Sequence, residues 1–195
     1  MRRVSISRKT KETDIKLTLN IDGKGEAKIN TGCGFFDHML ELFTRHGRFD
    51  IEVVCNGDIN VDYHHTVEDV GIVLGQAFKK ALGDMKGIIR YGSTILPMDE
   101  SLILTSLDIS GRSYLKLDLP VRATKIGDFP IELVEEFFLA FVRHAGITLH
   151  VVKMAGTNAH HVVEGTFKSF ARSLKSAVAI DKEFANEIPS TKGVL

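Results

Sequence analysis

The sequence predicts an α+β fold made of a duplicated half-domain, in which two mostly antiparallel sheets flank a central helix layer. Two observations support this prediction. In each half, strand-like segments come first and helix-like segments follow. In addition, the block His64-His65-x-x-Glu68 recurs as His160-His161-x-x-Glu164 at an offset of 96 residues.

The duplication extends beyond the histidines. Residues 19–23 are similar to residues 107–111 at an offset of 88, and Arg45-His46 matches Arg143-His144 at an offset of 98. The offset changes through insertions while the order is kept, which is typical of an internal repeat. We therefore expect one domain over residues 1–195, made of two repeats at about 1–92 and 93–195.

The first half opens with a strand, because residues 13–21 alternate apolar and polar side chains with the period of a half-buried strand. A turn at Gly23-Lys24-Gly25 ends it. The segments that follow show apolar residues at strand or helix spacing. In order, we expect a strand at 26–30 that returns after the turn, a helix at 36–46, a strand at 49–55 and a helix at 66–82.

The second half repeats this plan. We expect strands at 101–110 and 113–120, a helix at 131–145, a strand at 148–154 and a helix at 160–180. Because each expected helix carries an apolar face, the two halves can pack their helices together between two outer sheets.

The composition limits the functional classes. The chain has 195 residues, of which 44% are hydrophobic, and a formal net charge of +0, so it can bury a core but offers no basic surface to nucleic acid. No apolar run is long enough to span a bilayer, and the polar start does not resemble a signal peptide. Cys33 and Cys55 are too few for a disulfide scaffold. We expect a cytoplasmic protein that binds neither nucleic acid nor membrane.

The two histidine blocks predict a metal site. Residues four apart on an α-helix lie about 40° apart around its axis, whereas neighbours diverge by about 100°. His64 and Glu68 can therefore share one ion while His65 faces elsewhere, and the second block repeats the arrangement. A single histidine at a helix start is commonly a cap or a surface group. Two blocks in register, with imidazole and carboxylate donors, favour a site for manganese, iron or zinc.

The sequence also resembles a known family, imidazoleglycerol-phosphate dehydratase of histidine biosynthesis. The shared motifs follow one another in the same order through nearly the whole chain. They are Arg8–Thr13, Gly34–Leu40, Arg45–Asp50, Asp62–Asp69, Arg90–Gly92, Pro97–Glu100, Asp108–Arg112, Asn158–Glu164, Phe167–Lys168 and Pro189–Gly193.

The resemblance implies a hydro-lyase that removes water from D-erythro-imidazoleglycerol phosphate, a small phosphate substrate, to give imidazole acetol phosphate. It also implies two Mn²⁺ ions per active site. The ligand positions carried over from the family are His38, His64, His65, Glu68, Glu136, His160, His161 and Glu164. Some members carry histidine where this chain has Glu136, and His144 is the alternative residue for completing the second metal site.

Elimination of water also needs an acid and a base beside the substrate. The resemblance places Glu12 and His46 in contact with it, with Glu12 the better candidate for the leaving group, although which residue is the acid stays open. Without the resemblance, Glu12 would be interpreted as a solvated glutamate at a strand edge, and His46 as a histidine at a helix C-terminus. The phosphate-binding positions implied by the family are Arg90, Arg112, Lys168, Ser190 and Lys192.

The resemblance further implies a homo-oligomer, a 24-subunit cage with its active sites at subunit interfaces. Metal binding would then couple to assembly. We also expect the polar C-terminal tail, residues 189–193, to become ordered over bound substrate. We interpret the two histidine blocks as halves of one dimetal, imidazole-binding centre.

Two other functional classes use similar donors. A ferritin-like metal-binding protein would be all-helical and would carry Glu-x-x-His, the reverse order. A metallohydrolase would be expected to lack the arginine and lysine set for phosphate. Detection of the acetol product from imidazoleglycerol phosphate distinguishes all three classes.

Overall fold

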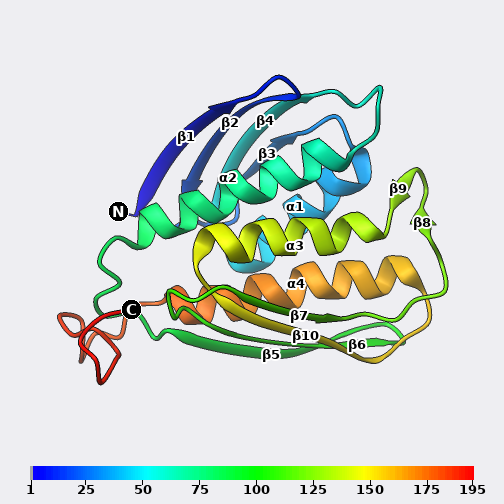
Figure 1. Ribbon diagram of the computed structural model, residues 1–195. Helices are drawn as coiled ribbons and strands as arrows, with labels where there is room; N and C mark the ends of the chain where they lie inside the picture. Colours follow the sequence, from blue (N-terminus) through cyan, green and yellow to red (C-terminus); the bar gives the residue numbers. More distant parts are fainter. Residues whose placement is uncertain (1) are drawn as a thin grey trace.

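Two four-stranded sheets form the outer layers, and four helices pack between them (Figure 1). The computed structural model describes residues 2–195. The first half contains β1 (Arg3–Lys9), β2 (Thr13–Asn20), β3 (Ala27–Asn30), α1 (Gly34–Gly47), β4 (Asp50–Gly57) and α2 (His64–Leu82). The second contains β5 (Tyr91–Met98), β6 (Ser101–Asp108), β7 (Tyr114–Asp118), β8 (Lys125–Ile126), β9 (Phe129–Pro130), α3 (Glu132–Ala145), β10 (Thr148–Ala155) and α4 (Ala159–Val178).

The two sheets have the same topology. Their strand orders are β1-β2-β4-β3 and β5-β6-β10-β7, and in each sheet the last strand pairs parallel while the other pairs are antiparallel. This arrangement confirms the predicted α+β fold with a helix layer between two sheets.

One predicted connection is wrong. The segment that begins β3 does not return against β2 but pairs parallel with β4 at the far edge of the sheet. The reason is local: the Asp50 carboxylate accepts the backbone N–H groups of Lys24, Gly25 and Glu26, and Gly25 has a φ of 96°, so the chain is turned across the end of β4.

The sequence prediction also missed β1, β5 and the short β8–β9 hairpin. Strand β1 alternates between exposed and half-buried residues and has no buried face, so its apolar periodicity is weak. Helix α2 begins at His64, two residues earlier than expected, so both histidines of the first block lie in its first turn.

The helices pack in two pairs that cross between the halves, α1 with α4 and α2 with α3. Phenylalanine rings fill the space among them. Four buried rings form a closed cycle in which each contacts two others: Phe43, Phe78, Phe141 and Phe170. All four helices begin at the same end of the molecule, on the right in Figure 1. Their N-terminal side chains, including both histidine blocks, are thereby gathered at that end.

Candidate active site

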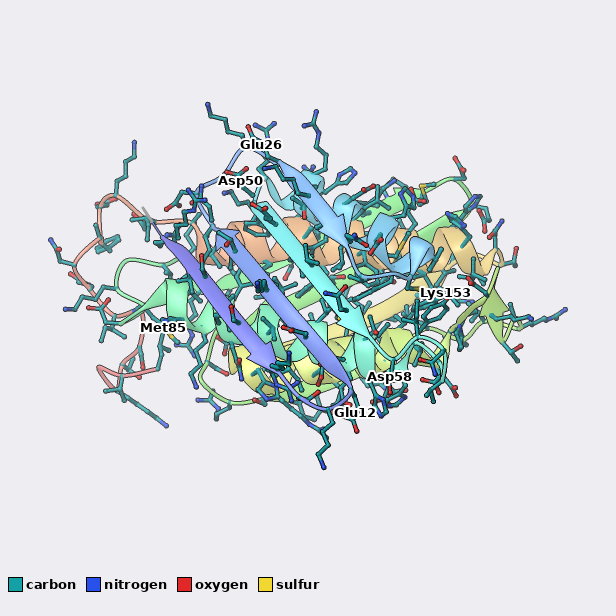
Figure 2. The ribbon with its side chains drawn as sticks, turned by 90° about the horizontal axis from the view of Figure 1, so that it is seen from above. Glu12, Glu26, Asp50, Asp58, Met85 and Lys153 are labelled. Carbon is teal, nitrogen blue, oxygen red and sulfur yellow. The ribbon has the colours of Figure 1, made fainter. Side chains whose placement is uncertain are left out.

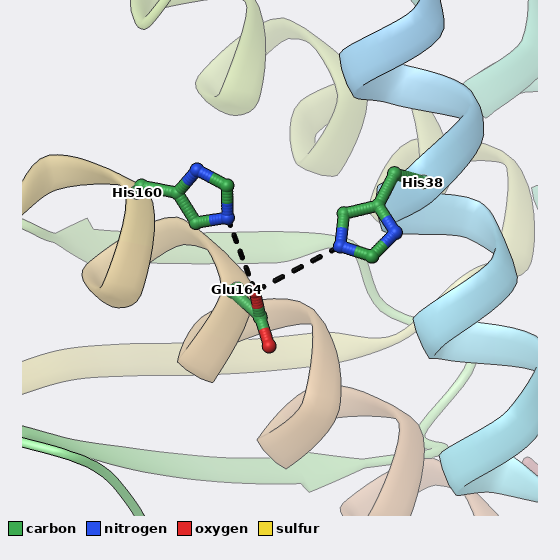
Figure 3. Close-up of side chains that lie close together, drawn as sticks. All are labelled: His38, His160 and Glu164. Carbon is green, nitrogen blue, oxygen red and sulfur yellow. Dashed lines mark hydrogen bonds and ion pairs between the residues drawn. The ribbon is translucent and has the colours of Figure 1, made fainter.

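Three predicted ligands from opposite halves of the chain converge in Figure 3. His38 lies in the first turns of α1, whereas His160 and Glu164 lie on α4. The Glu164 Oε2 atom is 3.2 Å from His160 Nε2 and 3.8 Å from His38 Nε2. Atoms bound to one ion at about 2.0–2.2 Å lie about 3–4 Å from one another, so this set of two imidazoles and a carboxylate fits a divalent metal.

The charge of Glu164 is maintained although the side chain is buried. Burial acts to raise its pKa, but the ammonium of Lys168, 2.5 Å from Oε1, and the neighbouring His160 together lower the pKa below its usual value. Glu164 therefore carries a negative charge between the Lys168 ammonium and the imidazoles, where its carboxylate can bind a metal ion.

The first histidine block has the same local geometry. His64 Nε2 lies 3.9 Å from Glu68 Oε2, one helical turn further along α2. Helices α2 and α3 run side by side in the same direction, with Gly71 against Phe137 and Gly75 against Phe141. Gly71 also lies against Ala140 and Gly75 against His144, and one turn earlier in this register Glu136 is level with Val67, the residue before Glu68.

His144 occupies a different part of α3. Its Cβ packs against Gly75, and its Nδ1 is 2.8 Å from the Ala140 carbonyl oxygen of its own helix. Gly75 lies eleven residues beyond His64, which is about 16 Å along a helix. The geometry therefore favours Glu136 over His144 as a partner for His64 and Glu68.

The second histidine of each block faces away from the first. The ring planes of His64 and His65 make an angle of 85°, and those of His160 and His161 make an angle of 84°. Each second histidine meets a carboxylate instead: His65 Nδ1 lies 3.0 Å from Asp58, and His161 Nδ1 lies 2.7 Å from Glu100. These hydrogen bonds raise the pKa of both histidines and lower the pKa of Glu100 to about 2.

Glu12 lies at the tip of the β1–β2 hairpin, and Figure 2 shows it next to Asp58. Its carbonyl oxygen accepts the Asp58 N–H at 3.0 Å. The hairpin is fixed to α2 by the buried Asp69 carboxylate, which lies 2.6 Å from Arg8 Nη1 and accepts the Thr13 hydroxyl at 2.5 Å. Glu12 is thus an exposed side chain on an anchored turn near the first histidine block.

His46 lies in the last turn of α1 and is half-buried. Burial is the largest cause that lowers its pKa, and the positive charges of Lys168 and Arg172 add to the effect. A neutral imidazole at this position can accept a proton near pH 7.

Four of the five predicted phosphate positions gather in one place. An open pocket of about 460 Å³ is lined by Arg90, Tyr91, Arg112, Pro189, Ser190, Thr191, Lys192, Val194 and Leu195. Arg90 holds the tail there, since its guanidinium donates to the Pro189 carbonyl at 2.7 Å while its other edge binds Asp108. Cations and backbone N–H groups of a turn suit an anion.

Lys168 is not in this pocket. Its ammonium binds Glu164 at the helix N-terminal end of the molecule, whereas Arg90 N donates to the carbonyl of Ala177 at the other end of α4. His160 and Ala177 are 17 residues apart on one helix, so the metal cluster and the phosphate pocket are about 25 Å apart within a chain.

Sequence reasoning missed three of the polar residues that shape these sites, Asp58, Asp69 and Glu100. Glu100 carried a usable signal, because it is the repeat partner of Glu12 at the same offset of 88 residues that relates residues 19–23 to 107–111. Asp58 has no such counterpart, and only the folded geometry connects it to His65.

Within residues 2–195, the helices include none long and apolar enough to cross a membrane.

Known proteins are similar to this chain in sequence and fold. The family model for imidazoleglycerol-phosphate dehydratase matches residues 31–174. The imidazoleglycerol-phosphate dehydratase of Azorhizobium caulinodans is 58% identical over 195 residues, covering 100% of this chain and 99% of that one. The protein of the same name from a Thermoanaerobacter species is also 58% identical, with 100% of both chains covered. The crystal structure of imidazoleglycerol-phosphate dehydratase from Staphylococcus aureus superposes with a TM-score of 0.84 at 38% identity, covering 92% of this chain and 99% of that chain.

Proposed function

This chain belongs to the imidazoleglycerol-phosphate dehydratase family, a family of hydro-lyases in histidine biosynthesis, and we propose that it converts D-erythro-imidazoleglycerol phosphate into imidazole acetol phosphate with two Mn²⁺ ions per active site. The observation that supports this most directly is the convergence of His38, His160 and Glu164. Two imidazoles and a carboxylate are a suitable donor set for a divalent ion, and they come from two helices that only the fold brings together.

The proposed ligands form two sets. One is His38, His160 and Glu164, and the other is His64, Glu68 and Glu136. His65 and His161 face away from these sets and would bind the ions of a neighbouring copy, which makes the two blocks halves of a shared dimetal centre. When bound, the ions would hold the substrate's imidazole ring and stabilise the negative charge that develops as the hydroxyl departs.

The chain's own side chains handle the protons. Dehydration breaks one C–H and one C–O bond, so one group accepts the carbon-bound proton and another protonates the leaving hydroxyl to release water. Glu12 and His46 are the proposed pair. Glu12 is exposed on an anchored hairpin, and the lowered pKa of His46 keeps its imidazole neutral and able to accept a proton.

The separation within one chain supports active sites built from several chains. The substrate is an imidazole ring, three carbons and a phosphate, which together span on the order of 10 Å. It cannot bridge the roughly 25 Å between the metal cluster and the phosphate pocket of one chain. The metal cluster and Lys168 of one copy would therefore meet the pocket of another, as expected for a closed homo-oligomer such as a 24-subunit assembly.

The decisive experiment incubates the purified protein with imidazoleglycerol phosphate and Mn²⁺ and follows imidazole acetol phosphate spectroscopically. We expect product with Mn²⁺ and none after chelation. Glu164→Gln should abolish turnover and weaken Mn²⁺ binding, while Glu41→Gln, an exposed residue on α1, should do neither. Mn²⁺ binding without product would favour a metal-storage role, and release of inorganic phosphate would favour a hydrolase; either result would overturn the proposal.

A further inference from the structure

The second histidine of each block is held by a carboxylate that the proposed mechanism does not use. Asp58 Oδ2 lies 3.0 Å from His65 Nδ1, and Glu100 Oε2 lies 2.7 Å from His161 Nδ1. In both cases the contact is made through Nδ1, so the ring presents its Nε2 edge away from the carboxylate. The same contact has therefore been built twice, once in each half, from different positions along the chain.

Each of these two residues is itself anchored in the fold. Glu100 lies in the β5–β6 turn, and its Oε1 accepts the backbone N–H groups of Thr157 and Asn158 at 3.2 and 2.8 Å, just before α4 begins. Asp58 follows β4, and its own N–H donates to the Glu12 carbonyl at 3.0 Å. The Glu100 carboxylate is thus held directly by backbone N–H groups, whereas Asp58 is anchored through its own backbone N–H.

The chemistry of imidazole gives this contact a consequence. A neutral imidazole carries one N–H, and a carboxylate beside Nδ1 places the proton there, which leaves the lone pair on Nε2 for a metal ion. We propose that Asp58 and Glu100 are positioning residues that hold His65 and His161 as Nδ1–H tautomers with Nε2 directed to Mn²⁺. This inference rests on the proposed function, because it assumes that both histidines are ligands.

The internal repeat explains why Glu12 is available for catalysis. Glu12 and Glu100 occupy the same place in their halves, the turn between the first two strands, at an offset of 88 residues. In the second half this glutamate, Glu100, is hydrogen-bonded to His161. In the first half Asp58 binds the histidine instead, and the Glu12 carboxylate makes no hydrogen bond or ion pair with the part of the chain that the structure describes. Because Asp58 takes the role that Glu100 has in the second half, the Glu12 carboxylate is left accessible to substrate.

The test measures Mn²⁺ binding to the assembled, chelator-treated protein by isothermal titration calorimetry, without substrate. Glu100→Gln and Asp58→Asn keep the shape of each side chain but remove its charge. Each should weaken one class of Mn²⁺ site by about 10–100-fold, the usual effect of losing such an outer partner. Glu100→Asp should restore part of the affinity. The matched controls are Glu52→Gln on the outer sheet face and Asp84→Asn beside Lys86, which should bind as the unaltered chain does.

Glu12→Gln separates positioning from catalysis, because it should abolish turnover and leave Mn²⁺ affinity unchanged. Circular dichroism and particle size show whether each variant is folded. If Asp58→Asn does not fold, Glu100→Gln alone tests the inference. Unchanged Mn²⁺ affinity in folded Glu100→Gln would overturn the inference while the proposed function stands. If the unaltered chain binds no Mn²⁺, the proposed metal sites and this inference both fail.

Discussion

At the scale of single residues, the Glu164 carboxylate links the proposed metal ligands to a proposed phosphate-binding residue. One oxygen faces the two imidazoles, and the other binds the Lys168 ammonium at 2.5 Å. Lys168 is also the one proposed phosphate-binding residue near the metal end. Its positive charge would therefore compete with a metal ion for Glu164, while it would assist binding of the phosphate.

Removing the Lys168 charge should therefore weaken substrate binding without weakening metal binding, and Lys168→Met tests this. Loss of a charge-assisted contact of about 1.5–3 kcal/mol should raise the KM for imidazoleglycerol phosphate by about 10–100-fold. Mn²⁺ affinity should rise or stay unchanged, because the competing cation is gone. Steady-state kinetics and calorimetric titration measure the two quantities. Lys182→Met, on the C-terminal segment after α4, is the control; an unaltered KM in Lys168→Met would contradict the assignment.

The directions of the histidines could be predicted from sequence because they depend on helix geometry alone. The spacing required His64 and Glu68 to share a side of α2 and His65 to face away, and their partners agree, since His64 lies beside Glu68 and His65 beside Asp58. The partners of the outward-facing histidines could not be predicted in this way. Asp58 reaches His65 only because the loop after β4 returns to the start of α2. The path of a loop cannot be predicted from apolar periodicity, because a loop has none.

At the scale of secondary-structure elements, the crossing of α2 and α3 depends on two glycines one turn apart. A Cβ added at Gly71 would lie 2.8 Å from the Phe137 carbonyl oxygen, and one at Gly75 would lie 2.6 Å from the Phe141 carbonyl oxygen. Both obstacles are backbone atoms, so a side-chain rotation cannot relieve them. The close approach of these helices sets the position of Glu136 relative to His64 and Glu68.

We predict that Gly75→Ala lowers the free energy of unfolding by about 1–2 kcal/mol. Alanine gains up to about 1 kcal/mol in helix propensity over glycine, but overpacking costs about 1–3 kcal/mol. Gly34→Ala is the control, because an added Cβ there meets nothing within 4 Å. Urea unfolding at fixed protein concentration measures both variants. Equal midpoints for Gly75→Ala and the unaltered chain would show that the helices separate without cost.

The turn that sends the chain into β3 has a pH-dependent component. Burial raises the pKa of Asp50, but hydrogen bonds from Lys24, Glu26, Asn20 and Gly25 outweigh it and lower the pKa below 3.8. A lowered carboxyl pKa stabilises the fold above the unfolded-state pKa, and this stability is lost as pH falls through the folded-state value.

Asp50→Asn should therefore lower the free energy of unfolding by about 1–2 kcal/mol at pH 7, the usual size of one charge-assisted contribution. The difference from the unaltered chain should shrink as pH falls below about 3.8 and vanish once Asp50 is protonated in the folded protein. Urea titrations between pH 7 and pH 3, with chelator present throughout, measure it. A difference that stays constant across this range would exclude the carboxylate as its source.

The elements that sequence predicted well are those with a strong apolar period. Helices α1, α3 and α4 were placed to within about two residues, and the buried strands β2 and β6 were found. The direction of β3 was not, because four residues cannot specify which neighbour they pair with, and Asp50, a residue 20 positions later than Asn30, decides it.

At the scale of the whole molecule, the two ends of the chain's fold carry different chemistry. The proposed metal ligands lie at the helix N-termini, and the tail and the arginines of the proposed phosphate pocket lie at the opposite end. Because the helices keep these ends about 25 Å apart, neither end is sufficient for the proposed reaction within one copy.

Deletion of residues 190–195 should therefore abolish or strongly reduce turnover without removing metal. The tail contributes Ser190 and Lys192 to the pocket, and its Pro189 carbonyl is the group that Arg90 holds. Mn²⁺ titration and product formation measure the two properties separately. Full activity after the deletion would exclude a role for the tail over the substrate.

Mixed assemblies test directly whether one active site draws on two chains. Glu164→Gln removes a proposed metal ligand and leaves the phosphate pocket intact, whereas Lys192→Ala does the reverse. Each variant alone should be inactive or nearly so. When differently tagged copies are co-expressed in equal amounts and mixed assemblies are isolated with both tags, random assortment places an intact metal cluster opposite an intact pocket in about a quarter of the sites. Activity should therefore return to about a quarter of the unaltered level. If each chain held a complete site, every site in the mixture would still carry one defect, and no activity would return.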